Sequence, residues 1–162
     1  MTSPKYQDIK KDSIPQIDEN GFQWKLVAGN YAGLTGPATT FSPIIAMMCF
    51  FKEGGKTQVE IPETYNVIFY ILDGTIETNG QQVTAGNMVS YEQNGLAIQL
   101  ESLHSGKLLL LAGEPINEPV SSSGPFVMII PVRSNRQSMI MKAVKWVAFN
   151  FKLYLYSNLF LP

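Results

Sequence analysis

The chain has 162 residues, a length typical of one domain that buries a core. Its composition is that of a lightly charged globular protein, with 45% hydrophobic and 15% charged residues. A formal net charge of −1 gives no general attraction to nucleic acid or to an anionic membrane, so we expect neither as a direct partner.

Residues 1–20 are polar, and Pro4 and Pro15 interrupt them. This pattern predicts an N-terminal arm or linker that ends in a turn at residues 18–21. The arm contains no apolar signal core. We therefore expect an intracellular, reducing compartment, either the cytoplasm or, in a eukaryote, the nucleus.

Residues 21–131 alternate between short apolar segments and turn residues, about every eight to twelve positions. Such spacing is typical of an antiparallel sandwich or barrel. The pair Asn79-Gly80 predicts a two-residue hairpin that joins residues 75–78 to residues 81–84. The other predicted strands are 22–28, 44–51, 57–62, 67–72, 87–91, 96–101, 108–111 and 126–130. Turns or loops are predicted at 73–74, 102–106 and 121–125.

The run from Leu108 to Leu111 consists of four consecutive leucines and is closed by Ala112-Gly113. A short continuous apolar run is typical of a strand that is buried on both faces. We expect this strand and its neighbours to supply the core. The predicted core residues are Phe69, Ile71, Leu109, Leu111 and Val127.

Cys49 is the only cysteine, which excludes an internal disulfide and a thiolate metal cluster. It lies in an apolar segment, residues 46–50, and we interpret it as a small buried hydrophobic residue.

Residues 132–162 differ in character from the rest. The stretch from residue 131 onwards carries five basic and no acidic residues, a net +5, which leaves −6 on residues 1–130. Met139, Val144, Val147 and Phe151 fit one face of a helix, whereas the residues after Phe149 alternate as in a strand. Lysines interrupt the apolar stretch, so a membrane span is not predicted. A short helix, a loosely attached tail and a translated non-coding end all fit this pattern.

Several ordered segments resemble the C-terminal domain of pirin-family proteins. They are LLLLAGEPINEPV at 108–120, GPFVM at 124–128, GLTGP at 33–37, TFSP at 40–43 and VIFYILDG at 67–74. The resemblance covers residues 4–130 and ends near Pro131. Pirins are bicupins, with two small β-barrels in one chain. The resemblance therefore implies an all-β fold over residues 21–131, a single antiparallel cupin barrel of the RmlC-like jelly-roll type, with a C-terminal helix as an option.

The same resemblance implies where a cupin metal site would lie. The first cupin motif corresponds to residues 55–74, and its two histidine positions and its glutamate position fall at Ile61, Glu63 and Val67. None of the three residues matches, and residues 87–91 lack the histidine of the second motif. We therefore expect no metal, cofactor-binding or catalytic residue in this chain, because the N-terminal barrel holds the iron in pirins.

The remaining candidates for chemistry are few. His104 is the only histidine, and we interpret it as a residue of the predicted turn at 102–106. Serines 121–123 lack a neighbouring histidine that could act as a base. The acidic candidates for acid–base chemistry are Glu60, Glu63, Glu114 and Glu118. No pattern brings two of them together, so a structural role is favoured for each.

The leading hypothesis is a pirin-like C-terminal cupin module without its own metal site, acting as a structural or interaction domain or as a fragment of a pirin. One alternative is half of a pirin-type quercetin 2,3-dioxygenase that needs a separate metal-bearing cupin. Another is a small-ligand-binding barrel. The expected partner is a metal-bearing cupin, or a second copy bound through an exposed barrel face.

Overall fold

A computed structural model of the chain describes residues 6–93, 95–118, 121–123 and 126–128. The chain divides into two compact units, Met1–Ile116 and Asn117–Pro162. The elements of the first unit are η1 (Lys11–Ser13), β1 (Gln16–Glu19), β2 (Phe22–Ala28), β3 (Asn30–Tyr31), β4 (Leu34–Thr35), β5 (Ile44–Phe51), β6 (Lys56–Glu60), β7 (Asn66–Thr78), β8 (Gln81–Thr84), β9 (Met88–Tyr91) and β10 (Ala97–Gly113). The second unit contains β11 (Ser121–Ser123) and β12 (Phe126–Met128).

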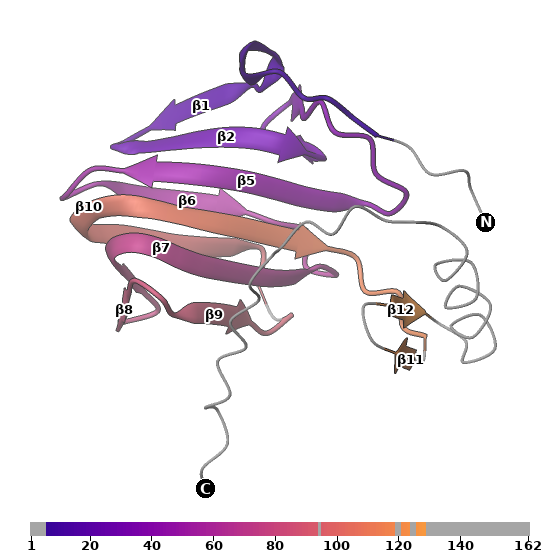
Figure 1. Ribbon diagram of the computed structural model, residues 1–162. Coiled ribbons are helices and arrows are strands. Elements are labelled where there is room, and N and C mark those ends of the chain that lie inside the picture. Colours follow the sequence, from indigo (N-terminus) through magenta and orange to yellow (C-terminus); the bar gives the residue numbers. More distant parts are fainter. Residues whose placement is uncertain (1–5, 94, 119–120, 124–125, 129–162) are drawn as a thin grey trace, which may run out of the picture. The chain divides into compact units, whose positions relative to one another are not determined.

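The main sheet of the first unit has eight antiparallel strands and folds into two layers, while β3 and β4 form a separate two-stranded sheet (Figure 1). The long strands β7 and β10 belong to both layers. The second half of β10 pairs with β5, while its first half pairs with β6. In the same way, β9 pairs with the first half of β7 and β8 with the second half. One layer is therefore β1-β2-β5-β10-β7-β9, the other is β6-β10-β7-β8, and the predicted all-β antiparallel architecture is confirmed.

The two long strands bend at the same place, where Gly74 lies against Gly106. The register between β7 and β10 shifts between Ser102 and Leu108, as expected for strands that turn a corner through bulges. A Cβ atom on Gly106 would overlap the carbonyl oxygen of Asp73, and one on Gly74 would lie 2.5 Å from that of Ser105. The predicted turns at 73–74 and 102–106 are therefore wrong. Both segments continue as strands, because the irregular segment of β7 lies opposite that of β10 and the pairing of the two strands resumes on either side.

A buried serine next to this bend holds the connection between the layers. Ser102 is 1% exposed, and its hydroxyl hydrogen-bonds to the backbone of the turn that joins β5 to β6. The Gly55 N–H donates to Ser102 Oγ over 2.8 Å, and the Ser102 hydroxyl donates to the Lys52 carbonyl. These bonds add to the hydrogen bond that the Gly55 N–H donates to the Lys52 carbonyl within the same turn, so the serine ties β10 to this turn.

The core lies between the two layers and is formed by alternate residues of each strand. Phe69 and Ile71 on β7 are fully buried, as predicted. The prediction for the leucine run is wrong by one residue, because Leu108 and Leu110 are fully buried while Leu111 is 45% exposed and Leu109 is half-buried. The register gives the reason, since Leu110 pairs with Phe69 and Leu108 pairs with Ile71. Directly paired residues point to the same face of a sheet, so the core face of β10 carries the even-numbered leucines.

The hairpin at Asn79-Gly80 is confirmed, with Thr75–Thr78 of β7 paired to Gln81–Thr84 of β8. Both loop residues have positive φ, 49° and 72°, as a tight hairpin turn of this type requires. The N-terminal arm is shorter than predicted, because residues 16–19 form β1 and pair with β2.

In the second unit, β11 pairs with β12 in an antiparallel hairpin. Residues 121–123 were predicted as part of a loop, so this part of the prediction is wrong. The Val127 side chain and the predicted tail at 132–162 lie outside the described residues. Among the residues that are described, no helix has the length and apolarity needed to cross a membrane.

The alternation in β10 predicts unequal effects for adjacent leucines. We expect Leu110→Ala to lower the free energy of unfolding by roughly 2–5 kcal/mol, because it removes a fully buried side chain and leaves a cavity. Leu111→Ala should cost less than about half as much, because this side chain already contacts solvent. Urea unfolding of both variants measures the difference, and equal losses would contradict this register.

The bend predicts that Gly106 cannot accept a side chain. Gly106→Ala should destabilise the fold by about 1–3 kcal/mol or more, because the added methyl group overlaps backbone that has no room to move. Gly95→Ala is the control, since a Cβ atom there meets no atom within 4 Å. Thermal melts compare the two, and a Gly106→Ala protein as stable as the control would show that the strands do not meet here.

Candidate functional site

Of the three positions that the pirin resemblance assigns to a cupin metal site, two are filled by core side chains. Ile61 and Val67 are each 5% exposed and belong to the main hydrophobic cluster, whereas Glu63 is exposed on the turn between β6 and β7. Isoleucine and valine offer no lone pair to a metal, so the residues at this place do not fit an iron site. Across the described part of the chain, no group of three or more His, Cys, Asp or Glu residues is placed to hold a metal ion.

Two further candidates from the sequence lie in surroundings that do not favour chemistry. His104 is exposed and lies within β10, where it pairs with Thr75 of β7, so it is not part of a turn. Cys49 is fully buried on β5, as predicted. Burial raises the pKa of the Cys49 thiol far above its ordinary value, so the thiol stays protonated and unreactive.

The acidic candidates lie in separate places. Glu63 and Glu114 are exposed in connecting segments, and Glu118 belongs to the second unit. Glu60 is the exception, because it lines a pocket together with Glu19, a residue that the sequence placed in a turn. Serines 121–123 form β11.

The pocket has a volume of about 620 Å³ and lies at the open edge between the two layers. Strand β1 ends one layer and β6 ends the other, and both contribute to the lining. Its side chains also come from β3, β5 and the turn after β6. The principal lining residues are Ile17, Glu19, Tyr31, Ile44, Glu60 and Tyr65.

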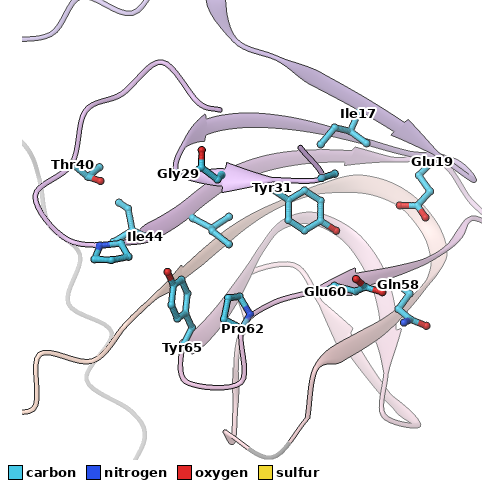
Figure 2. A pocket seen from close by; sticks show the side chains of 14 residues that line it. Ile17, Glu19, Gly29, Tyr31, Thr40, Ile44, Gln58, Glu60, Pro62 and Tyr65 are labelled. Atoms are coloured by element: carbon cyan, nitrogen blue, oxygen red, sulfur yellow. The ribbon is translucent and has the colours of Figure 1, made fainter. Parts of the chain in front are cut away.

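The two carboxylates of the pocket lie at the same end (Figure 2). The Tyr31 hydroxyl points towards the end that holds the carboxylates of Glu19 and Glu60, while Ile44 and Tyr65 lie at the other end. Glu19 is held in place by Thr57, whose hydroxyl donates to Glu19 Oε2 over 2.9 Å. Among the described residues that line the pocket, there are two acids and no base.

The electrostatics of Tyr31 reflect this arrangement. Burial raises the pKa of Tyr31 above its ordinary value of 10.0, a hydrogen bond with the Glu60 backbone lowers it in part, and the charges of Glu19 and Glu60 raise it further. The two carboxylates therefore act on the same phenol from different strands.

Little in the sequence indicates this pocket, because its residues are far apart in the chain. The one signal is the alternation in residues 16–19, which places Ile17 and Glu19 on the same face once the segment is recognised as a strand.

Comparison with known proteins identifies close relatives. Residues 47–149 match the model of the pirin C-terminal cupin domain. The chain is 34% identical to Pirin-1 of Arabidopsis thaliana over 134 residues, which is 79% of this chain and 47% of that protein. It is 31% identical to a pirin-like protein of Solanum lycopersicum over 88% of this chain and 48% of the relative.

A solved structure agrees in both sequence and fold. A quercetin 2,3-dioxygenase from Acinetobacter baumannii superposes with a TM-score of 0.83 and 31% sequence identity. The match covers 88% of this chain and 51% of that one. The chain thus spans about half the length of the relatives that it matches.

The pocket geometry predicts the titration of Tyr31. We expect its pKa to lie above 10.0 and to decrease in Glu19→Gln and in Glu60→Gln, because each change removes a nearby negative charge. Titration of ¹³C-labelled tyrosine by NMR measures these values. Glu53→Gln is the control, since Glu53 is an exposed acid outside the pocket. An equal change in all three variants would mean that the two carboxylates do not face Tyr31.

The sign of this shift also sets its effect on stability. The pKa of Tyr31 is higher in the folded than in the unfolded state. The protonated phenol therefore contributes fully to the free energy of unfolding below pH 10.0, and this contribution is lost as the pH rises through the folded-state pKa.

Proposed function

Since the chain belongs to the pirin family, with its C-terminal cupin domain, we propose that it acts as a non-catalytic packing module that binds a metal-bearing cupin half. In this proposal the partner half, in the same or another polypeptide, holds the iron. The module supplies the surface against which that half is stabilised.

The observation that carries the proposal is an apolar outer face on the larger layer. Met48, Leu109, Tyr70 and Met88 pair in turn across four neighbouring strands, so they form one row on the sheet surface. All are at least partly exposed, and Met88 is 62% exposed. Phe50, Leu72 and Leu111 extend the row with exposures of 42%, 38% and 45%. We call these seven residues the outer apolar face.

A face of this kind is uncommon on a protein that works alone. Exposed apolar patches larger than a few hundred Å² generally mark interaction sites. A stable interface buries roughly 800 Å² on each partner and has an apolar centre with a polar rim. Lys25 lies at the border of the outer apolar face, with its ammonium group 4.8 Å from the centre of the Phe50 ring.

The relatives indicate the occupant. The chain spans about half of each relative. The resemblance to bicupins implies that the other half is a second cupin barrel. The apolar side chains at Ile61 and Val67 support the division of roles, because a half that cannot ligate iron needs a partner for any iron chemistry.

A second candidate function follows from the solved relative. That protein is named a quercetin 2,3-dioxygenase, and this chain matches about half of it. A complex of this chain with a metal-bearing half would then be the enzyme, with the metal and its ligands contributed by the partner. The module would affect catalysis only through the stability and shape of that half.

We expect this chain to form a one-to-one complex with the metal-bearing half of a pirin, and iron to be retained by the complex and not by this chain alone. Sedimentation and elemental analysis measure the two quantities. Tyr70→Lys and Leu111→Lys should each weaken the complex by about tenfold or more, because a charge is buried among apolar groups. Gln82→Lys, on the exposed strand β8, is the control and should bind normally.

Three results would contradict the proposal. They are stoichiometric iron on this chain alone, equal weakening by the control, and a symmetric dimer of this chain in place of the mixed complex.

A further inference from the structure

The pocket between β1 and β6 has no part in the proposed packing function. None of the residues that line it belongs to the outer apolar face. Its volume of about 620 Å³ is within the range of small-molecule sites, roughly 300–1,000 Å³. The chemistry of its walls is specific enough to indicate a ligand class.

We propose that this pocket binds a small organic cation with an apolar body, such as a primary amine. The amine group would lie between the carboxylates of Glu19 and Glu60 and beside the Tyr31 hydroxyl. The apolar body would lie along Ile44 and Tyr65.

The sign of the charge follows from the lining. Among the described lining residues, Glu19 and Glu60 are the only charged ones, and no lysine, arginine or histidine is present to neutralise them. An anion would be repelled by both carboxylates, whereas a cation gains a charge-assisted hydrogen bond to each. Both acids also act on Tyr31, which places their charges at one end of the pocket.

The end that holds the carboxylates is prepared before any ligand arrives. Thr57 donates to Glu19 Oε2, so the side chain of Glu19 is oriented without being neutralised. The Tyr31 hydroxyl points towards the same end of the pocket as the two carboxylates. Side chains that are already positioned lose less conformational entropy on binding.

An organic cation fits better than a metal ion. Calcium takes six to eight oxygen ligands, and two carboxylates on separate strands supply too few. In the described residues, no cluster of three acidic or other metal-ligating side chains occurs at this place. The end away from the carboxylates, with Ile44, Pro62 and Tyr65, would cover the carbon skeleton of an amine, which a bare ion lacks.

The test compares two probes of nearly the same shape, 2-phenylethylamine and 2-phenylethanol, which differ in one positive charge. Calorimetry on the full chain measures their affinities, and NMR of the tyrosine rings locates the site. We expect the amine to bind at least about tenfold more tightly than the alcohol, which is the scale of one hydrogen bond to a charged group. The ring signals of Tyr31 and Tyr65 should shift with the amine.

Variants assign the effect to the two acids. Glu19→Gln and Glu60→Gln should each weaken amine binding by about tenfold and leave alcohol binding unchanged. Both substitutions are nearly isosteric, and the amide that replaces the Glu19 carboxylate keeps an acceptor oxygen for the Thr57 hydroxyl. Glu53→Gln removes the same charge outside the pocket and should bind the amine as the wild type does.

Three outcomes would overturn the inference. They are no binding of the amine at millimolar concentration, equal affinity for the amine and the alcohol, and equal weakening by Glu53→Gln. The result is independent of whether a metal-bearing half binds the outer apolar face, so the two proposals can fail separately.

Discussion

The close approach of two backbones at Gly74 and Gly106 is the constraint on which the rest of the first unit depends. At this point β7 and β10 leave one layer and enter the other while they stay paired. Because β10 is continuous across both layers, its two neighbours β5 and β6 lie in opposite layers. The Ser102 hydroxyl then hydrogen-bonds to the turn that joins β5 to β6. The open edges β1 and β6 face one pocket as a result. A single pair of glycines thus determines both the barrel and the position of its pocket.

Local patterns in the sequence predicted the strands well, and they failed where pairing decides the outcome. The alternation in residues 22–28 and the Asn79-Gly80 turn each carry a signal within a few residues. Four consecutive leucines carry no alternation, so only the pairing with Phe69 and Ile71 determines which two are buried. Gly74 and Gly106 resemble turn residues in the sequence. Their role, which is to let two strands distant in the chain approach each other, is seen only in the folded structure. The pocket was missed since Glu19, Tyr31 and Glu60 meet only in the folded chain.

Two of the three positions that the resemblance assigns to the first cupin metal motif lie in the hydrophobic core. Ile61 and Val67 now contribute to the hydrophobic cluster, where full burial of such side chains is worth roughly 1.5–3 kcal/mol each. Histidines at the same positions would be partly desolvated and would need hydrogen-bond partners. Ile61 and Val67 therefore stabilise the fold at these two positions. The two acidic side chains of the pocket, Glu19 and Glu60, lie instead at the edge between the layers.

The single thiol, that of Cys49, can report the opening of the first unit, because it is buried in the folded state. It lies on β5, paired with Trp24 on one side and Leu108 on the other, and no solvent reaches it in the folded state. An alkylating reagent can therefore react only with molecules in which the sheet has separated at its middle. Because the chain has no second cysteine, each labelled molecule records one such opening. The rate of alkylation therefore reports how often the barrel comes apart, without any added probe.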